Sequence, residues 1–580
     1  MPVAEQKPKK TSTPLRSPTR SNGPLVRRGT VYETTLVPPA RSADLQGPPP
    51  SGSSVRLYRT NPETATAAKL TSREQMRQLL GRLAPAVLLG ILAFTLVLVV
   101  TDPPGPGLDP DAMQYMGAAE SLAAQGAYRI PSATWTSGDS TSPLAHFPPG
   151  YSTALAIPVS LGMAPPQAAR LVEALAAAVT VMTLALVVAS ATTAIAAAAL
   201  GAALVVTPAM VTVHLSVLSE PLFLALLALT LAAMVYAPEH PLRAGITAAL
   251  GAMVRYAGAS LVGAVVLWAF LRRAALRERM RRAALAALPA ILLEAAWVIR
   301  THFAAGGTHA IRRFALYGDI GPTLAGGGVT LRDWLVPPTD PDWTLPHAGA
   351  IALAAGAVLV TLVVLGARAA REDARAGSPA AWRVLRACAL LLTCYVGMIA
   401  VSRLVADPAI PLDERILAPF LLLVVTVTTV AIAGWWRAGT SRIVRIVVTA
   451  AFVVWWIGSA SVARDDASFA LDYGSDFAGE EWRSSAVLDW ARTWGGTHPL
   501  YTNWPAAVYF HLHRASYALP ARGEGRSLGA FADTLRRRNG RVLLFTAPNA
   551  DDIPADSIVA QRGLRVVARF VDGVVLAPAP

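Results

Sequence analysis

The chain alternates between long apolar runs and short polar connections over most of its length. A run of about 20 apolar residues can cross a bilayer as a helix, and in hydrocarbon a helix satisfies its own backbone polar groups. The pattern therefore predicts an α-helical polytopic membrane protein with about 11 transmembrane helices. A shorter apolar segment, Ser152 to Met163, is expected to lie at the interface. The predicted spans are 83–100, 168–188, 190–207, 213–236, 242–257, 258–271, 284–299, 347–367, 383–401, 416–434 and 443–460.

The apolar runs stop after Ser461, where the composition becomes that of a soluble domain. Helical and strand patterns follow one another there, and a hairpin is expected at Asp572-Gly573. Residues 461–580 are therefore predicted to form a small α/β domain outside the membrane. Helices are expected over 480–494, 505–512, 528–538 and 555–562, and strands over 499–503, 541–546, 564–570 and 574–577.

The positions of the charges agree with a membrane protein. The chain has 580 residues, of which 53% are hydrophobic and 15% charged, and its formal net charge is +14. Lys and Arg gather in residues 1–82 and in short connections, as cytoplasmic segments do, so no nucleic-acid partner is expected. Residues 1–82 are predicted to be a disordered basic tail in the cytoplasm, next to anionic lipids. The basic connections contain Arg272, Arg273, Arg277, Arg279, Arg281, Arg282, Arg368, Arg371, Arg375, Arg383, Arg437, Arg442 and Arg445.

The connection from Thr101 to Tyr151 follows the first span and is acidic and rich in turns. Small and apolar residues recur at helical spacing from Asp111 to Gln125, which predicts a short amphipathic helix on the membrane surface. Tyr115 follows Asp111 by four residues, so the two side chains share one face of that helix. With the basic tail in the cytoplasm, this first outer loop lies on the outer side of the membrane.

Other ionisable residues fall at the same outer face in this topology. Each costs roughly 2.5 to 3.5 kcal/mol inside a membrane segment, so several together indicate a functional cavity. They are Glu220, Arg255, Arg300, Arg403, Asp407, Asp413, Glu414 and Arg415, with Tyr256 beside them.

These ionisable residues, and the aspartates and the histidine of the first outer loop, also have structural interpretations. Arg300 and Arg415 could extend to lipid headgroups from helix ends. Asp109 and Asp111 could cap a helix. His146 could be an ordinary loop histidine. These alternatives stay open for each residue taken alone.

The chemistry is narrowed by the motifs that the sequence lacks. No group of His, Cys or carboxylate residues has metal-site spacing, and no P-loop, GxSxG or GxGxxG occurs in its proper context, so no cofactor is expected. An acidic loop with arginines at a membrane surface suits a sugar that is attached to a lipid phosphate. Arginine stabilises the phosphate leaving group, and a carboxylate can accept the proton of the incoming hydroxyl.

At these residues the chain resembles the GT-C glycosyltransferases, in particular the bacterial dolichyl-phosphate-mannose mannosyltransferase type (family 39) and the RgtA/B/C/D-like domain. The resemblance extends from about residue 83 to 520 and depends on the order of loose motifs. The matching residues are Asp111, Tyr115, Ala119, Gly126-Ala127-Tyr128, HFPPGY at 146–151, SEPLF around Glu220, RYAG at 255–258, WVIR ending at Arg300, DERILAP containing Arg415, YTNWPAAVYF at 501–510 and ALP at 518–520.

The resemblance implies an inverting sugar transfer from a polyprenyl-phosphate donor, usually without a catalytic metal. It places the catalytic base at Asp111, with Asp109 as its partner or substitute. Many relatives have an Asp-Glu pair where this chain has Asp111-Ala112, so the choice between the two aspartates stays open. The residues expected to bind the substrates are Arg255, Arg300 and Arg415 for the lipid phosphate, and Tyr115, His146, Tyr151, Glu220 and Tyr256 for the sugar or the acceptor.

The sequence therefore favours a hexosyl or pentosyl transferase of the bacterial inner membrane. It would act at the outer face on an envelope lipid, glycan or protein, with a cytoplasmic N-terminus and an extracytoplasmic C-terminus. The Gly-rich outer loop 301–346 is expected to close over the substrate as a lid. The main alternative is a transporter or a flippase for lipid-linked sugars, although the sequence lacks the paired repeats and midplane charges of transporters. A catalytically inactive scaffold for envelope assembly is a third possibility.

Overall fold

The structure is a computed structural model that describes residues 72–305, 316–318, 320–338, 347–406, 410–494, 496–521, 528–547 and 553–580. Residues 1–71 of the predicted disordered tail lie outside the described residues. The same holds for Asp407 and for residues 306–315, 319 and 339–346 of the predicted lid.

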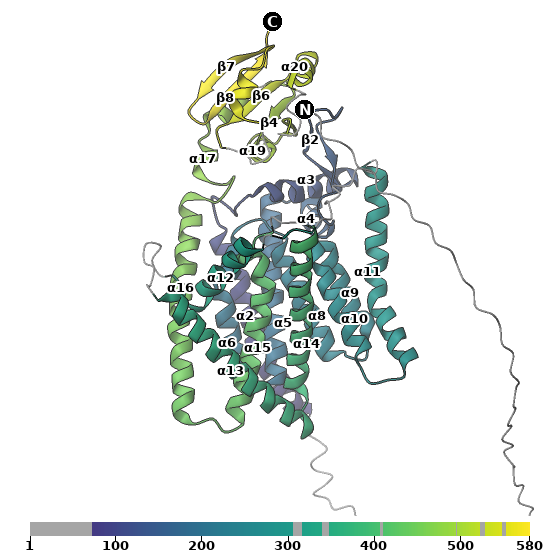
Figure 1. The fold of residues 1–580 in the computed structure, drawn as a ribbon, viewed down its shortest axis with the longest axis vertical. Coiled ribbons are helices and arrows are strands. Elements are labelled where there is room, and N and C mark those ends of the chain that lie inside the picture. Colours follow the sequence, from purple (N-terminus) through teal and green to yellow (C-terminus); the bar gives the residue numbers. More distant parts are fainter. Residues whose placement is uncertain are drawn as a thin grey trace, which may run out of the picture. The chain divides into compact units, whose positions relative to one another are not determined.

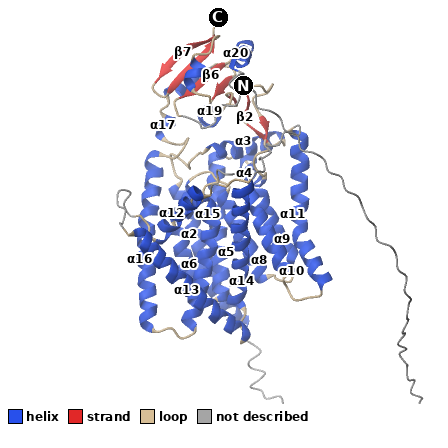
Figure 2. Cartoon of the chain, viewed as in Figure 1, coloured by secondary structure: helices blue, strands red, loops and turns tan. Residues whose placement is uncertain are grey.

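Most of the described residues form a helical bundle (Figures 1 and 2). Within the described ranges, seven helices are long and apolar enough to cross a membrane, or up to eight if the bent pair α6 and α7 is one span. Three shorter apolar helices accompany them, and each predicted span falls on one of these elements. The prediction of a polytopic helical membrane protein is thus confirmed. The helices are α2 (Ser72–Val100), α5 (Pro165–Ala191), α6 (Ala194–Val206), α7 (Pro208–Leu215), α8 (Glu220–Tyr236), α9 (Pro241–Val254), η1 (Tyr256–Gly258) with α10 (Ala259–Phe270), α11 (Leu276–Ala304), α13 (Ala348–Arg375), α14 (Ala380–Val401) with η2 (Ser402–Ala406), α15 (Glu414–Arg437) and α16 (Arg442–Tyr473).

Proline fixes helix starts that the apolar pattern misplaced. The predicted helix over 213–236 is wrong at its beginning, because α7 ends at Leu215 and residues 216–219 are not helical. The next helix, α8, begins at Glu220 and has Pro221 in its first turn. Backbone N–H groups in the first turn make no intrahelical hydrogen bond, so proline, which has no N–H, is tolerated there. Glu220 therefore lies at the first position of α8, and its carboxylate is free to extend beyond the helix end.

Figure 1 shows α3 (Pro110–Gln125) lying across one end of the bundle, which we call the α3 end. The short helix α4 (Gly150–Ser160) contacts both α3 and α5 there and occupies the segment that was expected not to cross. The connections from α7 to α8, from α9 to η1 and from α14 to α15 also reach the α3 end, because Ser216 pairs with Gly107, Arg255 binds Glu220 and Arg415 binds Asp109. The arginine-rich connections after α10, α13 and α15 lie at the opposite end.

The described part of the predicted lid contains α12 (Gly321–Leu335). Trp334 of this helix is buried and packs with Leu417 of α15. The Thr330 hydroxyl donates a hydrogen bond to the Leu412 carbonyl, with an Oγ1–O distance of 2.9 Å. These contacts attach α12 to the segment that leads into α15.

A six-stranded sheet lies beyond the helices in the C-terminal part of the chain (Figure 2). Its order is β2-β5-β4-β6-β8-β7, with β2, β5, β4 and β6 parallel and β8 antiparallel to both neighbours. The predicted strands and the closing hairpin are confirmed, although the hairpin turns at Val571-Asp572 and not at Asp572-Gly573. The strand β5 was not predicted, and the helix expected over 480–494 is broken into two. The elements are β4 (Leu500–Thr502), β5 (Ser516–Ala518), β6 (Arg541–Phe545), β7 (Leu564–Phe570), β8 (Gly573–Pro578), α17 (Glu480–Arg483), α18 (Ala486–Trp494), α19 (Pro505–Leu512), α20 (Leu528–Arg537) and α21 (Ala555–Val559).

One strand of this sheet comes from the first outer loop. The loop folds back through a two-stranded hairpin of β1 (Arg129–Ile130) and β3 (Ser142–Pro143), and β2 (Ser132–Thr134) between them pairs with β5. Trp135, which follows β2, is buried and packs edge-on against Phe531 of α20, with ring centroids 5.8 Å apart. The loop that carries α3 is thus part of the core of the C-terminal sheet.

Candidate active site

Arg415 is the centre of an ionic cluster at the α3 end. Its position is set by the start of α15, where the Asp413 carboxylate accepts the Ile416 N–H at 2.9 Å and the Glu414 carboxylate accepts the Thr212 hydroxyl at 2.8 Å. Both neighbours of Arg415 are therefore fixed, and its guanidinium group is left to face the carboxylates of α3 and α8.

Three carboxylates surround the Arg415 guanidinium. The Nη1–Oδ2 distance to Asp109 is 3.2 Å, the Nε–Oε1 distance to Glu220 is 3.1 Å, and the Nη2–Oδ2 distance to Asp111 is 3.7 Å. The first two contacts are hydrogen-bonded ion pairs, whereas the third is a longer electrostatic contact. Asp111 is therefore held least tightly by the arginine.

The two aspartates of α3 have different local roles. Asp109 is the N-cap, because its Oδ1 accepts the Ala112 N–H at 2.9 Å and Pro110 follows at the first helical position. Its side chain is 13% exposed, whereas that of Asp111 in the first turn is 36% exposed. Both oxygens of Asp109 are thus engaged, and Asp111 is the aspartate that a substrate can reach.

A second arginine completes the cluster from the break between α9 and α10. Arg255 has an extended backbone, and its Nη1 lies 2.5 Å from the Glu220 carboxylate and 3.0 Å from the Ser219 hydroxyl. The break depends on Gly258, where a Cβ would lie 2.3 Å from the Ala252 nitrogen. The Glu220 carboxylate, whose side chain is only 2% exposed, is therefore shared by two guanidinium groups.

Burial raises the pKa values of the aspartates next to this cluster. The pKa of Asp109 rises from 3.8 to about 7, because of burial first and of the Asp111 charge second, against the opposing effect of Arg415. Burial also raises the pKa of Asp111, with Arg415 as the largest opposing charge. A carboxyl group with a raised pKa is a better proton acceptor than an exposed one, so the cluster has the properties of a general-base site.

Aromatic side chains form the wall behind the cluster. The Tyr115 ring packs against Phe147 and Tyr151, with centroid distances of 4.8 and 5.1 Å, and its hydroxyl lies 3.3 Å from the Ser219 hydroxyl. The Tyr151 hydroxyl donates to the Glu173 carboxylate at 2.8 Å. The α3 helix is therefore held against α4, α5 and the start of α8 by ring contacts and hydrogen bonds.

The structure brings six of the predicted site residues into one network, namely Asp109, Asp111, Tyr115, Glu220, Arg255 and Arg415. Tyr151 joins them through the Tyr115 ring, and the ring of His146 packs against Phe147, with centroids 4.6 Å apart. Tyr256, the next residue after Arg255, is the first residue of η1, and its side chain is exposed.

Arg300 lies apart from the ionic cluster. Its Nη1 and Nη2 donate to the carbonyls of Leu144 and Tyr128, at 2.6 and 2.7 Å, and its guanidinium lies 4.9 Å from the Trp297 ring centroid. These contacts of Arg300 hold the first outer loop against α11. A phosphate-binding role for Arg300 remains a prediction.

Three residues that the sequence did not single out also belong to the site. Ser219 links Tyr115 to Arg255, and Glu173 of α5 accepts both the Tyr151 hydroxyl and the Leu218 N–H. Asp476, after α16, is one of the charges that raise the pKa of Asp109. Two of them gave a signal in the sequence, because Ser219 begins the SEPLF motif and Glu173 is a carboxylate inside a predicted span.

The helical bundle with a helix across its end has a known architecture: the chain has the GT-C fold. This confirms the broader part of the resemblance. No protein-family model matches the chain, and no curated protein matches it in sequence.

The fold is similar to that of the arabinofuranosyltransferase AftD from Mycobacteria, with a TM-score of 0.53 and 14% sequence identity over 85% of this chain and 40% of AftD. ArnT from Cupriavidus metallidurans, also solved with bound undecaprenyl phosphate, matches in its apo state with a TM-score of 0.43, at 15% identity over 85% of this chain and 97% of ArnT. The oligosaccharyltransferase of Archaeoglobus fulgidus in its apo form matches with a TM-score of 0.45, at 12% identity over 79% of this chain and 69% of that protein. The fold is assigned from the similarity to AftD, because its TM-score is above 0.5.

Proposed function

We propose that the chain is a glycosyltransferase that moves a sugar from a polyprenyl-phosphate donor to an acceptor in the cell envelope. The observation that carries the proposal is the convergence of Asp109, Asp111 and Glu220 on Arg415 and Arg255 at one end of a GT-C bundle. This arrangement supplies a proton acceptor and two cations within one site. Both are required when an alcohol displaces a phosphate from a sugar carbon.

In the proposed reaction, Asp111 accepts the proton of the acceptor hydroxyl. The hydroxyl oxygen then attacks the anomeric carbon, and the bond from that carbon to the phosphate oxygen breaks with inversion of configuration. The bonding electron pair leaves with the lipid phosphate, whose added charge the arginines stabilise. Asp111 suits the role of base better than Asp109, because it is more exposed and does not cap α3.

Arg415 and Arg255 are the proposed phosphate-binding residues. Both now pair with Glu220, so an entering phosphate would compete with that carboxylate for guanidinium N–H groups. Glu220 keeps the two cations in place in the absence of substrate. Tyr115, Tyr151 and His146 belong to one group of packed rings with Phe147 and are proposed to contact the sugar or the acceptor.

The site is proposed to face the outside of a bacterial inner membrane. The arginine-rich connections lie at the opposite end of the bundle from α3, and positive connections favour the cytoplasm. In this orientation the N-terminus is cytoplasmic and the C-terminal sheet is extracytoplasmic. The subclass of the enzyme, the family 39 mannosyltransferase type, is part of the proposal. The proposal includes pentosyl donors as well as hexosyl donors, since AftD is by name an arabinofuranosyltransferase.

The test is sugar transfer by membranes that contain the chain, with radiolabelled hexosyl and pentosyl polyprenyl phosphates and with extracted envelope acceptors. We expect label to move from at least one donor to an acceptor, and to be lost with Arg415→Gln. The rival function is tested in proteoliposomes with the same labelled lipids. Movement of a donor lipid between leaflets without any sugar transfer would replace the enzyme by a flippase.

A further inference from the structure

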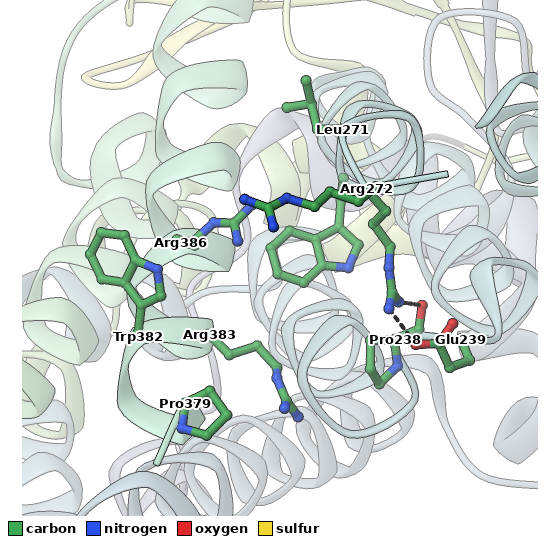
Figure 3. A pocket seen from close by; sticks show the side chains of 10 residues that line it. Pro238, Glu239, Leu271, Arg272, Pro379, Trp382, Arg383 and Arg386 are labelled. Carbon is green, nitrogen blue, oxygen red and sulfur yellow. Dashed lines mark hydrogen bonds and ion pairs between the residues drawn. The ribbon is translucent and has the colours of Figure 1, made fainter. Parts of the chain in front are cut away.

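A cavity lined by arginines lies at the end of the bundle opposite α3 (Figure 3). Its volume is about 580 Å³, which is within the range of ligand pockets. It opens between the connection that follows α8, the end of α10 with the loop after it, and the first turns of α14. The lining residues are Pro238, Glu239, Trp268, Leu271, Arg272, Arg273, Pro379, Trp382, Arg383 and Arg386.

The lining of this cavity carries four arginines and one carboxylate. Figure 3 shows Arg272 on one side and Arg383 and Arg386 on the other, around the same space. Arg272 binds the Glu239 carboxylate and the Pro238 carbonyl, and so uses the one negative charge of the lining. The other arginines therefore leave an excess of positive charge around the cavity.

Two of these arginines make no hydrogen bond or ion pair within the part of the chain that the structure describes. Arg383 donates to the Val235 carbonyl at the end of α8, with an Nη1–O distance of 3.2 Å. Arg273 and Arg386 are exposed, and neither has a hydrogen bond or an ion pair with any residue that the structure describes. Positive-inside connections explain the presence of arginines at this end, but not their gathering around one concave site.

Aromatic groups complete the binding surface. The Arg386 guanidinium lies 5.6 Å from the ring centroid of Trp268, which orients the cation over an indole face. The tryptophan ring therefore holds the Arg386 guanidinium at the cavity, where an oxygen-bearing anion can bind it.

We propose that this cavity binds a phosphate group, either a phosphodiester in a lipid headgroup or a soluble phosphate ester. Phosphate oxygens match the forked N–H geometry of arginine. The cavity lies where the helices end, which is the depth of lipid headgroups, and basic pockets between membrane helices bind such headgroups. The site is separate from the ionic cluster, and the proposal is independent of the transferase function.

The test uses the purified full chain in detergent and native mass spectrometry. The ligands are phosphatidylglycerol, phosphatidylcholine and glycerol 1-phosphate, each titrated separately. The pocket variant is Arg273→Gln with Arg386→Gln, which removes the two unengaged cations. The matched control is Arg368→Gln with Arg371→Gln, which removes two exposed charges of α13 outside the cavity.

We expect the pocket variant to weaken the first phosphatidylglycerol binding event about tenfold or more, and the control to change it less than about twofold. Binding of glycerol 1-phosphate as tight as that of the lipid would identify a soluble ester as the ligand. Binding of the lipid alone would identify a headgroup. Equal weakening in both double variants, with matching melting temperatures, would overturn the proposal, and so would unchanged binding in the pocket variant.

Discussion

Arg415 separates the roles of the two aspartates that the sequence could not rank. The pattern of the first outer loop identified Asp109 and Asp111 as candidates, since both are acidic residues at the start of a predicted surface helix. Their difference depends on contacts across the fold. Asp109 caps α3 and pairs with Arg415, which is 306 positions away in the chain, whereas Asp111 has only the longer contact. Spacing within the loop contains no information on that partner.

The raised pKa of Asp109 predicts how transfer depends on pH. Below about 7 the Asp109 carboxyl becomes protonated and loses its ion pair with Arg415, so we expect kcat/KM to fall as the pH drops through this value. The Asp109→Asn variant removes this titration and also the repulsion between the two aspartates. Because the variant lacks the ion pair with Arg415 at every pH, its kcat/KM should be lower throughout and should no longer fall with a midpoint near 7. Profiles of kcat/KM against pH for both proteins make the comparison, and an identical midpoint in the variant would show that Asp109 does not titrate as described.

Helix starts, more than helix interiors, build the site. Asp109 precedes α3, Glu220 begins α8, and Arg415 lies in the first turn of α15. The apolar pattern located these helices and their common end, which is why the candidate residues could be predicted. It could not place Ser219, because a lone serine in a connection has no periodic signal. It also could not show that Arg300 donates to main-chain carbonyls, which any residue type can supply.

The contacts of Arg300 predict a positioning role between two elements. Replacing it by Gln leaves the carbonyls of Tyr128 and Leu144 without their donor, and we expect a loss of about 1–3 kcal/mol in the free energy of unfolding. Thermal unfolding in detergent should show a lower melting temperature, while the control Arg368→Gln should match the wild type. An unchanged melting temperature together with weaker donor binding would instead give Arg300 the phosphate-binding role.

At the scale of the whole molecule, the first outer loop and the C-terminal sheet share one core. The sequence predicted four of the strands and the closing hairpin, because those runs have strand patterns and turn residues. It missed β2 and β5, each only three residues long, which pair with one another across 384 positions from Ser132 to Ser516. The length alone does not explain this, because β4 is equally short and was predicted within 499–503. The pairing of β2 with β5 is known only from the fold.

Trp135 tests whether this shared core connects the two regions. Trp135→Ala removes a buried ring that packs on Phe531, and core changes of this kind cost about 3–5 kcal/mol. We expect faster hydrogen exchange in β2, β5 and α20, with little change in α8 and α9. Trp494→Ala is the matched control, because Trp494 belongs to the same region and is 70% exposed. Equal exchange in the two variants would mean that the loop and the sheet are held together elsewhere.

The central claim is that Asp111 is the base of a sugar transfer at the α3 end. The most direct measurement is the rate of transfer by Asp111→Asn, once a donor and an acceptor are known, at equal expression and with donor binding retained. We predict a loss of about 10² to 10⁴-fold, since that is the usual contribution of a general base. The control is Asp139→Asn, an exposed aspartate of the same loop that pairs with Arg129, and it should stay within about twofold of the wild type. Full activity of Asp111→Asn would contradict the account and make Asp109 the next residue to replace.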